Sequence, residues 1–115
     1  IEISGVIGAK PEDKTLSKDM LETLQVESYY WKYAAELAED VKVPIILVGG
    51  NRSLDLMNEI LEKTKIRYFS LSRPFIREPD LINRWAGEDK RRAKCISCDK
   101  CFNPKGVSCI FNKNL

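Results

Sequence analysis

The chain has 115 residues, of which 43% are hydrophobic and 31% are charged, and its formal net charge at pH 7 is +2. This length leaves room for one small domain, and the composition is that of a folded globular protein rather than a disordered one. The small net charge does not indicate nucleic acid or an anionic membrane as a partner, and no apolar stretch approaches the ~20 residues of a membrane span.

The first elements in chain order are a strand, a loop and a helix. Residues 1–4 (IEIS) form a short apolar-rich segment, which predicts a strand. Residues 5–19 combine glycine, proline and many charges, which predicts a long surface loop. From about residue 21 to residue 41, apolar side chains recur at three- and four-residue spacing, which predicts a helix. We interpret the aromatic residues 29–33 (YYWKY) and Trp85 as core packing rather than as ligand contacts.

Two further strands alternate with helices after this point. Residues 43–50 (VPIILVGG) are a continuous apolar run, typical of a parallel strand covered on both faces. Ser53 is placed to cap a helix that runs to about Lys63. Residues 66–71 (IRYFSL) predict a third strand, and the helical region that follows is split by Pro79. The apolar face of the helix that Ser53 caps is expected to comprise Leu54, Met57, Ile60 and Leu61.

The order of strands and helices indicates an α/β fold with a parallel sheet. Three strands with two crossover helices leave both edges of the sheet open, and the chain begins inside an apolar run at Ile1. We therefore expect a C-terminal piece of a larger α/β protein, with a self-sufficient small domain as the alternative. Because open edges can pair with other strands, we expect the isolated chain to self-associate or form a homo-oligomer.

Two loops follow adjacent strands of the predicted sheet. Gly49 and Gly50 come after the second strand, and Ser72 and Arg73 come after the third. Parallel sheets build their ligand sites at the carboxyl ends of their strands. Glycines let the backbone approach an anion closely, and arginine can bind a phosphate through two donors. The loops together predict a phosphate site, with a plain turn and a surface arginine as the alternative.

All four cysteines of the chain lie within fifteen residues, and the chain has no histidine. Disulfides would require an oxidising compartment, and the lack of other cysteines disfavours a disulfide scaffold, so we expect a cytoplasmic protein. Four thiolates could hold a zinc ion or a [4Fe–4S] cluster. The Cys-x2-Cys-x2-Cys run favours the cluster, because zinc sites more often use two separated pairs. The predicted metal ligands are Cys95, Cys98, Cys101 and Cys109.

Residues 43–85, followed by this cysteine group, resemble the C-terminal part of the Old Yellow Enzyme-like NADH:flavin oxidoreductases. The nearest branch is that of the 2,4-dienoyl-CoA reductases, which carry an iron–sulfur cluster. Members of the family bind FMN on a (β/α)8 barrel, and the three predicted strands resemble barrel strands six, seven and eight. The resemblance implies that residues 1–88 form about three βα units of a flavin-binding TIM barrel. Residues 89–115 would then be a cysteine-rich metal-binding tail.

By this resemblance, Gly49, Gly50, Ser72 and Arg73 hold the FMN phosphate, although the family usually has glycine at the position of Ser72. The four cysteines would hold the iron–sulfur cluster, although the last two gaps between them are shorter here than in the family. In the intact protein, NADH or NADPH would pass a hydride to FMN, and the flavin would reduce an activated alkene or similar acceptor. The cluster would relay single electrons.

The resemblance places the catalytic residues on earlier strands, so no catalytic residue is assigned. Three of eight strands cannot close a barrel, and we therefore expect the isolated chain to be inactive. The alternative is a small, non-enzymatic α/β module whose four cysteines bind zinc and which acts in protein interaction. The sequence does not distinguish NADH from NADPH and does not identify the electron acceptor.

Overall fold

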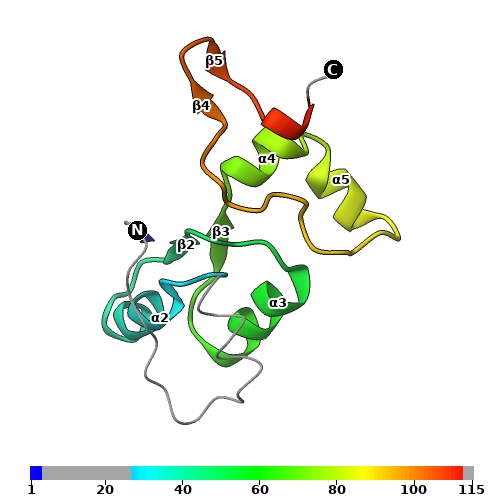
Figure 1. Ribbon diagram of the computed structural model, residues 1–115. Coiled ribbons are helices and arrows are strands. Elements are labelled where there is room, and N and C mark those ends of the chain that lie inside the picture. Colours follow the sequence, from blue (N-terminus) through cyan, green and yellow to red (C-terminus); the bar gives the residue numbers. More distant parts are fainter. Residues whose placement is uncertain (4–26, 113–115) are drawn as a thin grey trace.

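The computed structural model of the chain describes residues 1–3 and 27–112. Three short strands form a parallel sheet, β1 (Glu2–Ile3), β2 (Ile46–Val48) and β3 (Tyr68–Ser70), in the order β1-β2-β3 (Figure 1). Each lies within a segment predicted as a strand, and the expected parallel pairing is present. The predicted surface loop at residues 5–19 lies outside the described residues.

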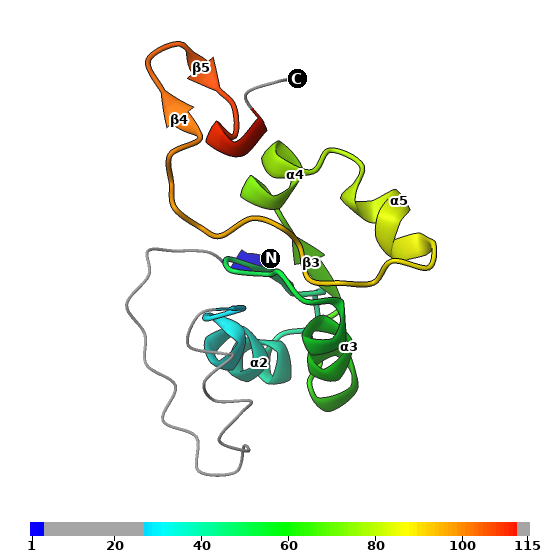
Figure 2. The ribbon, with the colours of Figure 1, turned by 45° about the vertical axis from the view of Figure 1, so that its right-hand side comes forward.

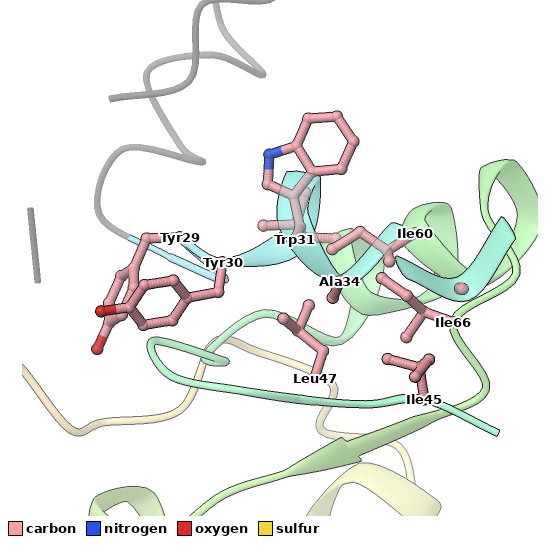
Figure 3. Close-up of a cluster of buried hydrophobic side chains, with 10 residues drawn as sticks. Tyr29, Tyr30, Trp31, Ala34, Ile45, Leu47, Ile60 and Ile66 are labelled. Carbon is pink, nitrogen blue, oxygen red and sulfur yellow. The ribbon is translucent and has the colours of Figure 1, made fainter. Parts of the chain in front are cut away.

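Two helices pack on one face of this sheet and form the main core with it. They are α2 (Trp31–Asp40) and α3 (Leu54–Lys63), which lie side by side in both ribbon views (Figures 1 and 2). Alanines of α2 pack against β2, and Ile60 of α3 and Ile66, which lies just before β3, complete the contact (Figure 3). The buried members of this core are Tyr29, Tyr30, Trp31, Ala34, Ala38, Ile45, Leu47, Leu56, Ile60 and Ile66.

Helix α2 begins later than the sequence predicts. Residues 28–30 form a turn instead of a helix, and Ser28 has a left-handed backbone with φ 47°. The Ser28 N–H donates to the carbonyl of Gly50 at 3.0 Å, which fixes the chain to the end of β2 before the helix starts. The earlier part of the predicted helix, residues 21–26, lies outside the described residues. Tyr33 is exposed, so the aromatic group is core packing only in part.

The helix predicted from Ser53 to Lys63 is confirmed, with one change in its buried face. Ser53 occupies the N-cap position, but its side chain makes no capping hydrogen bond. Leu56 is buried and Leu61 is exposed, which reverses the prediction for Leu61. The reason is that α3 contacts two cores. Leu56 packs into the main core, and Met57 packs into a second, smaller core.

The second, smaller core forms where α3 meets the C-terminal part of the chain. It joins α4 (Arg73–Arg77), α5 (Leu81–Ala86) and the chain before the cysteines, and its buried residues are Met57, Leu81, Trp85 and Ala93. The predicted break between two helices at Pro79 is confirmed, and α5 ends at Gly87. The indole N–H of Trp85 donates to the carbonyl of Arg91 at 2.9 Å. Both tryptophans are buried, as predicted.

The cysteine-rich tail has little regular structure. Strands β4 (Phe102–Asn103) and β5 (Gly106–Val107) form an antiparallel hairpin, and a 3-10 helix, η1 (Ile110–Asn112), follows. Figures 1 and 2 show the hairpin on the α4 side of the sheet, away from α2 and α3. Within the described ranges, none of the helices combines the length and apolar character needed to cross a bilayer. Whether the sheet belongs to a barrel stays a prediction.

Candidate functional site

A cavity of about 190 Å³ opens at the carboxyl ends of β2 and β3. The loop after each strand contributes to its wall, as expected for a parallel sheet. All four residues that the sequence places at a phosphate site line this cavity, namely Gly49, Gly50, Ser72 and Arg73. The structure therefore brings the predicted residues together, while their role in binding phosphate stays a prediction.

The glycine pair is required by the packing of an aromatic ring. Both glycines have left-handed backbones, with φ 105° at Gly49 and 71° at Gly50. A Cβ atom added at Gly50 would lie 2.5 Å from the Tyr29 ring, and one added at Gly49 would lie 2.9 Å from it. Tyr29 also lines the cavity. Sequence reasoning assigned the glycines to anion approach and missed the tyrosine that closes over them.

Asn51 ties the two strand ends together beneath the cavity. Its side chain is 1% exposed, and its amide nitrogen donates to the carbonyls of Leu47 at 2.9 Å and Ser70 at 3.1 Å. The Ser28 hydroxyl donates to the Asn51 side-chain oxygen at 2.7 Å. One side chain therefore connects β2, β3 and the turn before α2. Sequence reasoning missed it, and the available signal was a polar residue directly after a buried strand.

Arg52 lines the same cavity and is buried, with 2% of its surface exposed. Its Nη1 donates to the Asn51 carbonyl at 2.8 Å, and its Nη2 donates to the Ser97 hydroxyl at 2.9 Å. Burial lowers the pKa of Arg52 below its usual range, and the Cys95 sulfur acts in the opposite direction. Arg52 thus connects the cavity at the strand ends to the cysteine segment, residues 95–109, a role that its position in the sequence did not indicate.

Arg73 lies between the cavity and the cysteines. It begins α4, its side chain is 16% exposed, and its Nη1 forms an ion pair with the Asp99 carboxylate. Burial opposes its charge, but Asp99 and the other neighbouring groups together raise the pKa of Arg73. Ser72 is exposed, and its carbonyl accepts the N–H of Phe75 at 3.0 Å, so α4 fixes its backbone.

The four cysteines surround a second cavity, of about 20 Å³, and Arg73 also lines it. Cys98 is exposed, the other three are half-buried, and all four are free thiols. The N–H of Ser108 donates to the carbonyl of Cys101 at 3.0 Å, which brings the two ends of the hairpin together. Cys101 and Cys109 therefore reach the same cavity although seven residues separate them.

Two residues of the cysteine segment have left-handed backbones, and the side chain of each contacts an arginine that lines the cavity at the strand ends. Ser97 and Asp99 have left-handed backbones, with φ 60° and 61°, which is uncommon for residues other than glycine. Arg52 donates to the Ser97 side chain, and Arg73 pairs with Asp99. The conformation of the segment around Cys98 is thus linked to the walls of the first cavity.

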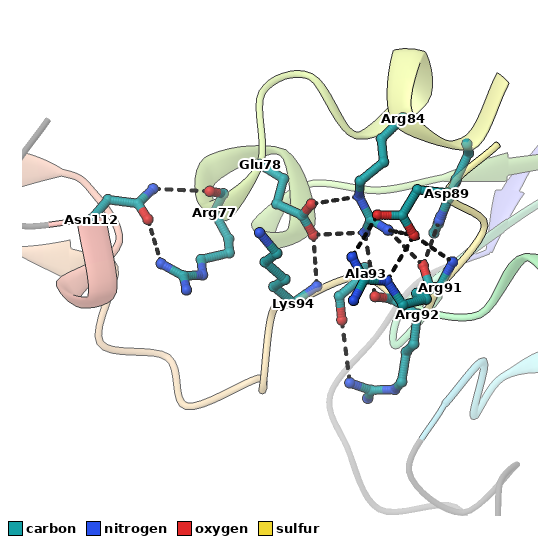
Figure 4. Close-up of polar contacts among 10 residues, drawn as sticks. Arg77, Glu78, Arg84, Asp89, Arg91, Arg92, Ala93, Lys94 and Asn112 are labelled. Carbon is teal, nitrogen blue, oxygen red and sulfur yellow. Dashed lines mark hydrogen bonds and ion pairs between the residues drawn. The ribbon is translucent and has the colours of Figure 1, made fainter. Parts of the chain in front are cut away.

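The cysteine segment is also anchored at its base by a buried ion pair (Figure 4). Glu78 accepts from Arg84 Nε at 2.9 Å and from the backbone N–H of Lys94 at 2.7 Å. Burial opposes ionisation of this carboxyl, but the bonds from Lys94 and Arg84 together lower its pKa. The network fixes the residue immediately before Cys95 to the link between α4 and α5.

The cysteines match a four-thiolate metal site in number and chemistry, and all four line the same cavity. In the described conformation, however, no three side chains of Cys, Asp or Glu among residues 1–3 and 27–112 are close enough to hold a metal ion. The thiols line one cavity from both ends of the hairpin, and one arginine of the first cavity borders them. A bound metal would therefore have to draw the four sulfurs closer together.

Comparison with curated proteins finds several reductases. The chain is 29% identical over 93 residues to a bilirubin reductase of Clostridium symbiosum and 27% identical over 91 residues to a 4,4'-dithiodibutanoate disulfide reductase of Rhodococcus erythropolis. It is 28% identical over 97 residues to a metal reductase of Desulforamulus reducens. These alignments cover 76%, 77% and 78% of this chain.

The chain spans a quarter or less of these relatives, since the same alignments cover 25%, 22% and 14% of their lengths. No protein-family model matches the chain, and no solved structure matches it. All three relatives are reductases by name, although they are named for different acceptors. Their common description supports a general oxidoreductase role.

Proposed function

We propose that the chain is the C-terminal part of an Old Yellow Enzyme-like, FMN-dependent oxidoreductase. Residues 1–88 would be about three βα units of the barrel, and residues 89–115 would be the metal-binding tail. The observation that carries the proposal is the cavity at the ends of β2 and β3, which gathers Gly49, Gly50 and two arginines. The similarity to three reductases supports the same conclusion.

The walls of this cavity suit a phosphate group. Gly49 and Gly50 present backbone without a Cβ atom, which lets an anion approach closely. Arg73 uses Nη1 for Asp99, and its other guanidinium donors are available for an anion. Arginine binds phosphate through a planar pair of donors, and such charge-assisted bonds are about twice as strong as neutral ones. FMN carries a terminal phosphate of this kind.

Bound FMN would supply hydride chemistry, taking electrons from NADH or NADPH and passing them to an activated alkene or similar acceptor. The residues of this chain would hold the phosphate and so orient the flavin. We propose no catalytic residue here, because the reacting ring would be met by other strands of the barrel. The isolated chain is expected to show no turnover for the same reason.

Flavin binding can be tested with a ligand pair that differs only in the phosphate. In fluorescence titrations we expect the chain to bind FMN about tenfold or more tightly than riboflavin. The reason is that a charge-assisted hydrogen bond contributes about 1.5–3 kcal/mol. Arg73→Met should remove most of this difference. Arg67→Met is the matched control, because Arg67 is an exposed arginine that donates only to backbone carbonyls. Equal binding of FMN and riboflavin to the unaltered chain would contradict the proposed phosphate site.

For the cysteine site we propose a [4Fe–4S] cluster, with a zinc ion as the alternative. Metal analysis of anaerobically purified protein distinguishes them, since a cluster contributes about four iron and four sulfide per chain. A cluster protein is brown, whereas zinc is colourless because its d shell is full. One zinc and no flavin binding would favour the non-enzymatic zinc module.

A further inference from the structure

Arg52 is a buried cation without a buried anion beside it. It is the largest side chain with less than 2% relative exposure in the described part of the chain. No carboxylate of the described residues lies within 4.0 Å of its guanidinium, whereas Arg73, Arg84, Arg91 and Arg92 each pair with one. Its Nε has no hydrogen-bond partner there either. Burying an unpaired charge costs several kcal/mol, so a missing negative charge is expected close by.

The contacts of Arg52 lead to the cysteine segment. Its Nη2 donates to the Ser97 hydroxyl, and its carbonyl accepts the N–H of Ala93 at 2.8 Å. Both residues lie within two positions of Cys95, and the nearby Cys95 sulfur favours the charged form of Arg52. Arg73 is close enough to repel Arg52, which adds to the cost of the unpaired charge.

A metal held by the four cysteines would supply the missing charge. Four thiolates around a divalent ion leave a net charge of about −2 on the site. Outer partners that hydrogen-bond to metal ligands orient them and stabilise the loaded state. Cys95 is the ligand nearest in sequence to both segments that Arg52 holds, and Ser97 supports the loop on its other side.

We infer that Arg52 is the counter-ion of the metal-loaded cysteine site, a positioning residue that holds the Cys95 sulfur and, through Ser97, the loop that follows it. This inference rests on the proposed metal site. It assigns to Arg52 a task distinct from that of Arg73, which serves the phosphate. Among the described residues Arg52 has no carboxylate partner, and in the loaded chain the negative charge of the metal site would pair with it.

The inference makes the effect of Arg52 depend on the metal. Replacing Arg52 with Met keeps much of its volume and removes its charge. Zinc affinity is expected to fall about 10- to 100-fold, as it does when other outer partners are removed. The stability of the metal-free chain is expected to change little or to rise, because an unpaired charge has been removed. A merely structural role would destabilise the metal-free chain and leave zinc affinity intact.

The experiment compares the unaltered chain, Arg52→Met and the control Arg67→Met. Zinc affinity is measured by competition with a chelator, and urea unfolding is followed in the metal-free state. Cobalt substitution gives a spectroscopic readout, because the thiolate-to-cobalt charge-transfer band shifts when a hydrogen bond to a ligand sulfur is lost. Arg52→Lys keeps the charge, and it is expected to restore part of the zinc affinity. It also supplies a folded comparison if the Met variant does not fold.

Weaker zinc binding and a shifted cobalt band in Arg52→Met, with neither in Arg67→Met, support the inference. Unchanged zinc affinity in Arg52→Met overturns it and leaves the metal site standing. Arg52 also lines the cavity at the strand ends, so phosphate is the other candidate for its counter-charge. Weaker binding of inorganic phosphate with unchanged zinc binding would therefore overturn the inference in favour of that anion. An unaltered chain that binds no zinc, cobalt or iron overturns both the inference and the proposed metal site.

Discussion

The two cavities share Arg73 as a wall but are built in opposite ways. The first cavity lies at the carboxyl ends of two sheet strands, and two of its lining residues, Asn51 and Arg52, are almost completely buried. The cysteine cavity is formed by a segment with two two-residue strands and one short 3-10 helix. Ile96, Phe102 and Val107 in that segment are 60% exposed or more.

The difference separates a site shaped by packing from a site with little packing, whose proposed metal would contribute to its structure. Buried hydrogen bonds and the contact of the Tyr29 ring with the two glycines shape the cavity at the strand ends. The cysteine segment is largely exposed, and polar side chains, among them Arg52, Arg73 and Glu78, make its contacts with the rest of the chain. Binding a metal to such a segment contributes folding free energy directly. When no metal is bound, substitutions at the first cavity should therefore lower the free energy of unfolding more than substitutions in the cysteine segment.

The largest effect is expected for Gly50→Ala. The new Cβ would clash with the Tyr29 ring, and alanine would have to adopt φ 71°. Overpacking and backbone strain together should lower the free energy of unfolding by about 4 kcal/mol. Gly106→Ala is the control, because Gly106 has φ 124° with no atom near its Cβ position. It should show the strain alone, about 1 kcal/mol or slightly more. Equal costs in urea unfolding would show that Tyr29 does not pack on Gly50.

Asn51→Ala should lower the free energy of unfolding by about 3 kcal/mol. The substitution removes the Asn51 donor to the carbonyls of Leu47 and Ser70 and the acceptor of the Ser28 hydroxyl. Asn103→Ala in the hairpin is the matched control, since the Asn103 side chain accepts one exposed backbone N–H. Its cost should be below about 1 kcal/mol. A cost for Asn51→Ala no greater than for Asn103→Ala would refute the proposed link between the strand ends.

Glu78→Gln should cost about 2 kcal/mol at pH 7, because Arg84 loses its buried carboxylate partner. The pKa of Glu78 is lowered in the folded chain, so its ionised form stabilises the fold above the ordinary carboxyl value of 4.5. This contribution is lost as the pH falls through the lower, folded value. Urea unfolding between pH 7 and pH 3 should show the two proteins converging as the pH falls. A difference that stays constant with pH would exclude a role for the Glu78 charge.

The smallest effect is expected for Cys98→Ser in the metal-free chain. Cys98 is exposed, so the change should alter the free energy of unfolding by less than about 0.5 kcal/mol. The same substitution should sharply weaken metal binding, because one of four ligands is lost. Parallel urea titrations with and without zinc measure both effects. A large cost in the metal-free state would mean that packing, rather than metal, holds the cysteine segment.

Local patterns predicted the fold where local interactions decide it. The strands, the helix after Ser53 and the break at Pro79 follow from apolar runs, a cap and a proline. The start of α2 could not be predicted, because Tyr29 and Tyr30 have helical spacing in the sequence. A hydrogen bond from Ser28 to Gly50, more than twenty residues away, holds that stretch in a turn instead.

The sites show the same division. Ligand sites of parallel sheets lie at the carboxyl ends of the strands, and this rule predicted that the two glycines, Ser72 and Arg73 lie close together. All four line one cavity. Arg52 could not be recognised, because an arginine after Gly-Gly-Asn resembles a surface residue. In the structure it is buried, and the chain returns 45 residues later to place Ser97 against it. The four cysteines line one cavity, as their spacing suggested, whereas metal binding by them stays a prediction.

The two tryptophans lie in different cores, Trp31 at the start of α2 and Trp85 in α5. Replacing one of them with phenylalanine leaves a chain whose intrinsic emission reports a single core. With Trp85 alone, the fluorescence would follow the part that carries the cysteine segment. With Trp31 alone, it would follow the α2–sheet–α3 part. One dye-free optical signal can thus show whether the chain melts as one cooperative body or as two.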